Sequence, residues 1–186
     1  MKKFILASGS PRRKQLLSDI NLDFECILAD EEKNISKIHF SYELIEEIAK
    51  TKVLSVYEKV KNDEVIIIGA DTVVVLDNKI LTKPNDEQDA IDILKQLSNK
   101  THFVVTSHCI KKGVKELVES VTSYVTFNNL SDKDIINYVK EKQPLDKAGA
   151  YGIQELPESF VKKVDGDFNN IIGLSTNKIL EMLKKI

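Results

Sequence analysis

Arg12 and Arg13 stand side by side in the stretch ILASGSPRRKQLL, and they are the two arginines among the 27 basic residues of the chain. Pro11 suits the first position of a helix and Ser10 its N-cap, which places both arginines just inside a predicted helix N-terminus. Free backbone N–H groups and the helix dipole favour an anion there, and guanidinium adds planar donors that match phosphate oxygens. Both arginines could instead lie on a solvated helix face, but the use of lysine everywhere else favours a phosphate-binding site.

Asp71 interrupts the apolar run VIIIGADTVVVL, which is otherwise typical of a buried strand. A buried carboxylate without a partner is costly, so this position needs an explanation. One alternative is an aspartate at a strand end that makes a local turn hydrogen bond, which Gly69 favours. The other is a carboxylate at the rim of the sheet, where α/β proteins bind their ligands. The residues alone leave both open.

Lys52 lies within the apolar stripe of the helix predicted over residues 42–60, where Ala49, Val53 and Val56 share its face. Its ammonium either extends past the edge of the core into solvent or reaches into a cleft toward a phosphate or carboxylate.

Acidic residues cluster at Asp30, Glu31 and Glu32, which taken alone indicate a solvated loop. A magnesium site on a nucleotide needs only one or two protein carboxylates, so Glu32 together with Asp71 would suffice. Lys83, just before a proline, is a weak signal by itself. The chain lacks the G-x-x-x-x-G-K-[ST] motif, which excludes a P-loop enzyme.

Composition narrows the class of protein. A chain of 186 residues with 42% apolar and 30% charged residues predicts one domain, residues 1–186, and the net charge of −2 argues against a nucleic-acid-binding protein. Cys26 and Cys109 lack the spacing of a zinc site or a disulfide framework, so both are expected to be reduced thiols. His39, His102 and His108 lack the spacing of metal ligands and are expected to be structural. Without a leader or a membrane-spanning run, we expect a cytoplasmic protein with no membrane contact.

Alternation and capping signals predict the order of the elements. Strands are expected over 3–8, 65–76, 101–111 and 115–127, the last two as a hairpin about Gly113, with a further strand and turn within 159–168. Helices are expected over 10–20, 42–60, 86–99, 131–142 and 175–186, and a structured loop over 145–154. This mixture predicts an α/β fold with a mixed β-sheet flanked by helices.

Taken together, these stretches resemble the Maf family of nucleoside triphosphate pyrophosphatases. The matching segments, in the family's order, are LASGSPRR, AKTKVLSV, IGADTVVVLDNKILTKP, THFVVTS and QPLDKAGAYGIQ. SPRR, GADT and YGIQ are similar to the branch that hydrolyses dTTP and UTP, and differ from the sister branch that acts on 7-methyl-GTP. The resemblance implies two lobes with a central cleft, as in inosine triphosphate pyrophosphatase-like proteins.

The resemblance also implies an activity and a set of roles. The activity is metal-dependent hydrolysis of pyrimidine nucleoside triphosphates to the monophosphate and pyrophosphate, with Mg²⁺ or Mn²⁺ as the cofactor. The implied roles are triphosphate binding by Ser10, Arg13, Lys52 and Lys83, metal ligation by Glu32 and Asp71, proton abstraction by Asp71, and base selection by Arg12, Thr72 and Gln154.

Two departures from the family pattern stand out. Glu155 follows Gln154 where the family usually has glycine, which bears on fine substrate preference, and GLS at residues 173–175 replaces the more usual GLP.

Two alternatives stay open: a pyrophosphatase acting mainly on modified pyrimidine nucleotides, and a nucleotide-sensing regulator of septum formation with little or no turnover. The family often forms homodimers, which is the whole support for a homodimer here.

Overall fold

The computed structural model describes residues 3–30 and 39–186. In this part of the chain the strands are β1 (Phe4–Leu6), β2 (Phe24–Cys26), β3 (Ile66–Leu76), β4 (Lys79–Leu81), β5 (Thr101–Lys112), β6 (Lys115–Phe127) and β7 (Val161–Asp165). The helices are α1 (Pro11–Asp19), α2 (Tyr42–Val60), α3 (Glu87–Leu97), α4 (Asp132–Lys142), α5 (Phe168–Ile172) and α6 (Thr176–Leu183).

One mixed sheet runs through the described residues in the order β2-β1-β3-β5-β6-β7, with β4 paired to β3. β1 is parallel to both β2 and β3, and the remaining pairs are antiparallel. β5 and β6 form the long predicted hairpin, whose turn contains Gly113 at a φ of 52°. The mixed α/β fold predicted from the sequence is therefore confirmed.

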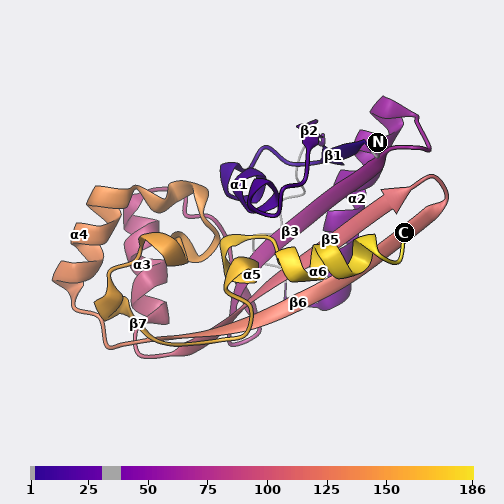
Figure 1. Cartoon of the computed structure of the whole chain (residues 1–186). Helices are drawn as coiled ribbons and strands as arrows, with labels where there is room; N and C mark the ends of the chain where they lie inside the picture. Colours follow the sequence, from indigo (N-terminus) through magenta and orange to yellow (C-terminus); the bar gives the residue numbers. More distant parts are fainter. Residues whose placement is uncertain (1–2, 31–38) are drawn as a thin grey trace.

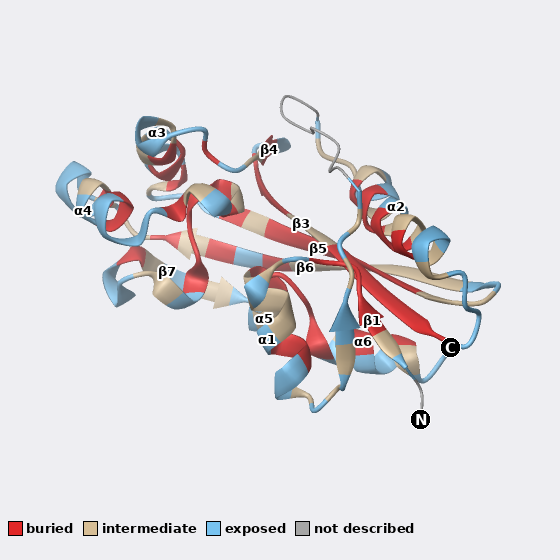
Figure 2. Ribbon diagram, turned by 90° about the horizontal axis from the view of Figure 1, so that it is seen from above, coloured by how far each residue is buried: buried red, intermediate tan, exposed pale blue. Residues whose placement is uncertain are grey.

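Helices cover both faces of the sheet at the end that contains β1 (Figure 1, Figure 2). Ile66 and Ile68 of β3 pack against α1 and α6, whereas Ile67 packs against α2 on the opposite face. Because successive side chains of a strand point to opposite faces, a strand covered on both sides must be apolar at every position. This explains the unbroken run of isoleucines and defines the first lobe: β1, β2, α1, α2 and α6 with the adjoining ends of the long strands.

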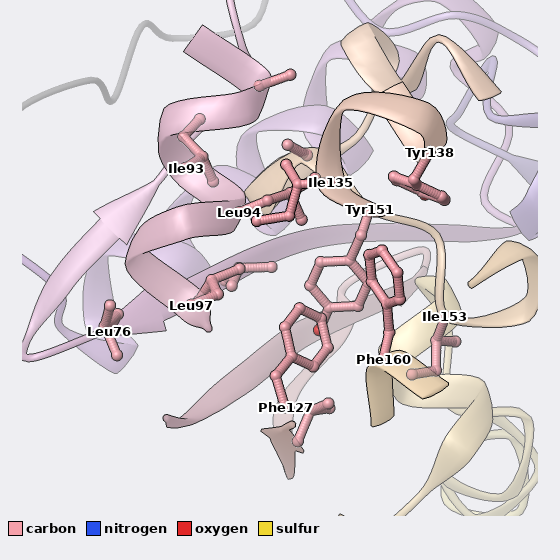
Figure 3. Close-up of a cluster of buried hydrophobic side chains, with 14 of the residues drawn as sticks. Leu76, Ile93, Leu94, Leu97, Phe127, Ile135, Tyr138, Tyr151, Ile153 and Phe160 are labelled. Atoms are coloured by element: carbon pink, nitrogen blue, oxygen red, sulfur yellow. The ribbon is translucent and has the colours of Figure 1, made fainter. Parts of the chain in front are cut away.

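The second lobe gathers α3, α4 and β7 around the other end of the long strands (Figure 1). In its core the aromatic side chains of Phe127, Tyr138, Tyr151 and Phe160 lie together beside the aliphatic residues of α3 (Figure 3). None of its buried residues belongs to the apolar clusters of the first lobe, and the partly buried Ile172, at the end of α5, packs against both lobes. The two-lobed arrangement therefore has a physical basis in separate cores that share the long strands.

Some elements differ from the sequence prediction. β2 and β4 were not predicted, because three residues are too few for an alternating pattern to be recognised. The short helix α5 was also missed. The loop expected over 145–154 contains short 3₁₀ helices at Ala148–Ala150 and Ile153–Glu155. No helix in the described ranges has both the length and the apolar character needed to cross a membrane.

His102 and His108 lie buried on one face of β5, as the sequence analysis expected of structural histidines. His102 Nε2 lies 2.7 Å from the hydroxyl of Tyr151, and His108 Nε2 accepts a hydrogen bond of 2.9 Å from the backbone N–H of Ser175. Burial lowers the pKa of each imidazole from 6.5 to about 4. Both rings are therefore neutral in the folded protein at neutral pH.

These two histidines predict a loss of stability in mild acid. Their folded pKa lies below the unfolded value, so the unfolded chain binds more protons once the pH falls below 6.5. The stabilisation from each neutral, buried imidazole is complete above pH 6.5 and is lost as the pH falls toward 4. At pH 5 the free energy of unfolding has fallen by roughly 2 kcal/mol for each histidine. Urea unfolding at pH 7.5, 6 and 5 should show the free energy of unfolding falling over this range.

His102→Gln should remove about half of that pH dependence, and His39→Gln, at an exposed histidine, provides the matched control. A free energy of unfolding that stays constant between pH 7.5 and 5 in the unmodified protein would contradict this prediction.

Candidate active site

The candidate site occupies a notch in one edge of β3. Along that edge β1 pairs with residues 66–68 and β4 pairs with residues 74–76, whereas β5 pairs continuously along the other edge. Asp71 and Thr72 lie in the interval between β1 and β4. Asp71 is therefore in the middle of an 11-residue strand and opposite Ser107, so the first of the two alternatives, an aspartate at a strand end, is wrong. Its position next to the C-terminal end of β1 agrees with the alternative of a ligand-binding rim.

Asp71 is held by Lys52 of α2. Lys52 Nζ donates a hydrogen bond of 2.5 Å to Asp71 Oδ1, and Lys52 is only 7% exposed. The lysine thus reaches into the cleft, which settles the choice that the sequence left open. Gly69 makes this contact possible, because a Cβ at that position would lie 2.5 Å from Val53 Cγ2 and would push α2 away from β3.

Arg13 is fixed by three parts of the chain that are distant in sequence. Its Nε donates to the carbonyl of Gly173 (2.9 Å), Nη2 donates to Thr72 Oγ1 (3.0 Å), and Nη1 lies 3.4 Å from Ser8 Oγ. Thr72 Oγ1 also lies 2.9 Å from Thr106 Oγ1. The guanidinium is therefore oriented before any ligand binds, and Thr72, predicted to select the base, contacts the residue predicted to bind phosphate.

The N-terminus of α1 lines the same cavity as Asp71. Pro11 occupies the first helical position and Ser10 the N-cap, as predicted, but the Ser10 side chain makes no capping hydrogen bond. Instead, the backbone N–H of Ser10 donates to Ser8 Oγ (3.2 Å). The N-terminus of a helix favours an anion, because its first backbone N–H groups have no acceptor in the preceding turn and the helix dipole is positive there.

Arg12 connects the two lobes. Its Nη1 donates a hydrogen bond of 2.8 Å to Asp146 Oδ2, and Lys147 Nζ donates one of 2.8 Å to Asp146 Oδ1. Although burial by itself raises the pKa of Asp146, the hydrogen bonds from Lys147 and Arg12 lower it to about 2. Asp146 is thus ionised throughout the physiological range and fixes the position of both cations.

One cavity joins these groups. Its volume is about 760 Å³, within the usual range for a small-molecule site. Every described residue with a predicted site role lines it: Ser10, Arg12, Arg13, Lys52, Asp71, Thr72, Lys83 and Gln154. Lys83 is exposed and follows β4, and Gln154 is exposed in the short helix Ile153–Glu155 of the second lobe. The predicted phosphate-binding cations therefore share one space with the predicted base-selecting side chains.

Few carboxylates of the described residues are placed to bind a divalent metal in the cavity. Glu32 lies outside the described residues. Asp30 lines the cavity, but its carboxylate binds Ser55 and Lys59, and these hydrogen bonds lower its pKa. Residues 3–30 and 39–186 contain no group of three or more potential metal-ligating side chains. Asp71 alone suits a magnesium site, because such sites combine one or two carboxylates with substrate phosphates and water.

The chain is similar to a known protein family over almost its whole length. A family model described as "Maf-like protein" matches residues 3–186. The chain belongs to the Maf family. Its curated relatives include the dTTP/UTP pyrophosphatase of Aquifex aeolicus, 41% identical over 99% of this chain and 95% of the relative. Another is the dTTP/UTP pyrophosphatase of Clostridium beijerinckii, 42% identical over 99% of both chains.

Solved structures extend the likeness of this Maf fold. The Ham1 protein of Staphylococcus aureus superposes with a TM-score of 0.57 at 16% identity, covering 99% of both chains. A nucleoside-triphosphatase of Mycobacterium abscessus, titled a dITP/XTP pyrophosphatase, superposes with a TM-score of 0.51 at 12% identity, covering 98% of this chain and 94% of the other. At these identities the likeness concerns the fold alone.

Sequence reasoning missed several residues of this Maf-family site. The carbonyl of Gly173 orients Arg13, and Asp146 and Lys147 form the wall opposite α1. The adjacent opposite charges of Asp146 and Lys147, within a segment otherwise rich in small residues, were a signal that could have identified the pair. Nothing in the local sequence indicated that the carbonyl of Gly173 receives a hydrogen bond from a residue 160 positions away.

Proposed function

We propose that this Maf-family chain hydrolyses pyrimidine nucleoside triphosphates, dTTP and UTP, to the nucleoside monophosphate and pyrophosphate. The observation that carries the proposal is a lysine-bound carboxylate, Asp71, in the same cavity as a pre-oriented arginine and a helix N-terminus. Such a site binds a polyanion and also has a proton acceptor. The curated names of its relatives support pyrimidine substrates.

The described side chains divide the reaction among them. Arg13, Lys52 and Lys83, with Ser10 and the first turn of α1, bind the triphosphate and offset its negative charge. Asp71 accepts a proton from a water molecule as the water oxygen bonds to the α-phosphorus. The bond from the α-phosphorus to the bridging oxygen breaks, and pyrophosphate leaves with that oxygen. Lys52 binds Oδ1 of Asp71 and so holds the carboxylate in place for this step.

Mg²⁺ or Mn²⁺ is part of the proposal. Asp71, with Glu32, would hold the ion together with the phosphate oxygens of the substrate. A bound divalent ion supplies charge neutralisation on the phosphates and polarises the scissile phosphoryl group.

Arg12, Thr72 and Gln154 are proposed to select the pyrimidine. A glutamine amide offers one donor face and one acceptor face, which suits the N3–H and a neighbouring carbonyl of uracil or thymine. Arg12 contributes through its bond to Asp146 across the cavity. Because the Thr72 hydroxyl contacts Arg13, we propose that Thr72 acts on selection by positioning that arginine.

Pyrophosphate release from a panel of nucleoside triphosphates tests this function. The panel contains dTTP, UTP, 5-methyl-UTP, CTP, dCTP, ATP, GTP and 7-methyl-GTP, each with Mg²⁺ and then with a chelator. We expect metal-dependent release from dTTP and UTP, with little from the purine nucleotides. Faster release from 5-methyl-UTP than from UTP and dTTP would favour a role on modified pyrimidine nucleotides.

Two results would contradict the proposal. Preference for 7-methyl-GTP would place the chain in the other branch of the family. Nucleotide binding without release from any member of the panel would favour the regulator of septum formation. A single domain over residues 1–186, a cytoplasmic location, a homodimer and the lack of nucleic-acid binding remain proposals from the sequence.

A further inference from the structure

Lys147 is a buried cation in the cavity to which the predicted chemistry gives no role. It follows the short 3₁₀ helix Pro144–Asp146 in the second lobe, and it is only 8% exposed although its side chain lines the cavity. Lysine is rarely buried without a partner, because desolvation of the ammonium is costly. Its placement at the cavity wall, opposite the N-terminus of α1, therefore points to a use for the charge.

Two carboxylates hold the Lys147 ammonium. Nζ lies 2.8 Å from Asp146 Oδ1 and 3.4 Å from Glu155 Oε2. Asp146 is bound at the same time by Arg12, so the two cations share one anion across the cavity. The ammonium is thus fixed in position by its two carboxylate partners, which is the condition for a directional hydrogen-bond donor.

Gly152 places this donor next to Gln154. A Cβ at Gly152 would lie 3.1 Å from Lys147 Cε and 3.3 Å from Gln154 Nε2. The lysine stem and the glutamine amide therefore border the same bare stretch of backbone. A side chain at position 152 would crowd both groups, so the glycine lets the lysine stem and the glutamine amide lie together against the backbone at the cavity wall.

We propose that Lys147 selects the base by donating a hydrogen bond to O4 of uracil or thymine, an inference that rests on the proposed function. The Watson–Crick edge of these bases presents an acceptor, a donor and an acceptor. Gln154 supplies one donor and one acceptor, and Lys147 supplies the further donor that this edge requires. Cytosine has an amino group at C4, which cannot accept a hydrogen bond from an ammonium, so Lys147 favours uracil and thymine without stabilising cytosine.

Lys147→Met tests this role, because methionine keeps much of the apolar stem against Gly152 and removes the ammonium. The specificity constant kcat/KM is measured with UTP, dTTP and CTP for the unmodified protein and the variant. Loss of a hydrogen bond from a charged donor should lower kcat/KM for UTP and dTTP by about 10- to 100-fold. The value for CTP should change by less than about threefold, so the preference for UTP over CTP shrinks at least about tenfold.

Lys163→Met, at an exposed lysine of β7, is the matched control and should leave all three values unchanged. A second measurement uses 4-thio-UTP, which carries sulfur, a weak acceptor, in place of O4. It can be made on the unmodified protein even if the variant does not fold. We expect the unmodified protein to use 4-thio-UTP about tenfold less efficiently than UTP, and Lys147→Met to use the two about equally.

The outcomes separate the two proposals. Equal losses for UTP and CTP in Lys147→Met, or equal use of UTP and 4-thio-UTP by the unmodified protein, would overturn the role of Lys147 and leave the proposed function intact. An unmodified protein that hydrolyses neither UTP nor dTTP would overturn both.

Discussion

Asp71→Asn is expected to lower kcat for UTP hydrolysis by about 10²- to 10⁴-fold, the usual contribution of a positioned general base. The amide oxygen of asparagine can still accept the hydrogen bond from Lys52, so the packing of α2 on β3 should survive. Nucleotide binding should remain, because the predicted phosphate donors are unchanged. Pyrophosphate release under saturating UTP, together with calorimetric titration of the variant with UTP, measures the two effects separately.

Asp77→Asn is the matched control for this experiment. Asp77 lies in the turn after the same strand, is well exposed, and makes a long ion pair of 3.9 Å with Lys100. Its φ of 50° is one that asparagine adopts readily, so the same chemical change there should leave kcat unaltered. If Asp71→Asn keeps more than about a tenth of the original rate, Asp71 is not the general base.

Arg13→Lys is expected to lower kcat/KM for UTP by about 100-fold although the charge is kept. The guanidinium donates to Gly173 and Thr72 through separate nitrogens and approaches Ser8 with a third. A lysine ammonium cannot span these positions, so the cation would lose its orientation toward the phosphates. The loss should appear mainly as a higher KM, measured by pyrophosphate release over a range of UTP concentrations at constant Mg²⁺.

Arg12→Lys is the comparison that makes this result specific. Arg12 binds Asp146 through a single nitrogen, a contact that lysine can reproduce, so the loss should stay below about tenfold. Equal losses at the two positions would show that position 13 requires only a positive charge near the helix N-terminus. That outcome would remove the argument from pre-orientation.

Local patterns in the sequence were sufficient for most elements of the fold. The predicted long strands and helices form, because each carries an apolar pattern that matches its own period and a cap or turn residue at its end. The same periodicity placed Lys52 in the buried stripe of α2, where it lies. Very short strands such as β2 and β4 carry too little pattern to be recognised and exist because a neighbouring strand offers hydrogen bonds.

The candidate site was predictable only in part. The sequence identified the residue types and, through the resemblance to the Maf family, the set that lines the cavity. It could not show that Asp71 lies in mid-strand, since that depends on where β1 stops and β4 begins along the same edge of β3. It also gave no role to Asp146 and Lys147. Their place in the site depends on the hydrogen bond from Arg12 to Asp146, which joins residues 134 positions apart.

The sequence by itself determined the elements, the family and the chemistry of the candidate residues, because helical and strand periods, capping and motif composition are local properties. Only the tertiary structure decided which of these polar and charged groups bind one another. Lys52 pairs with Asp71, Arg12 with Asp146, and Arg13 with Gly173 and Thr72, through chain separations from 19 to 160 residues. Such contacts depend on how the helices and loops pack on the sheet, and that packing is a property of the whole chain.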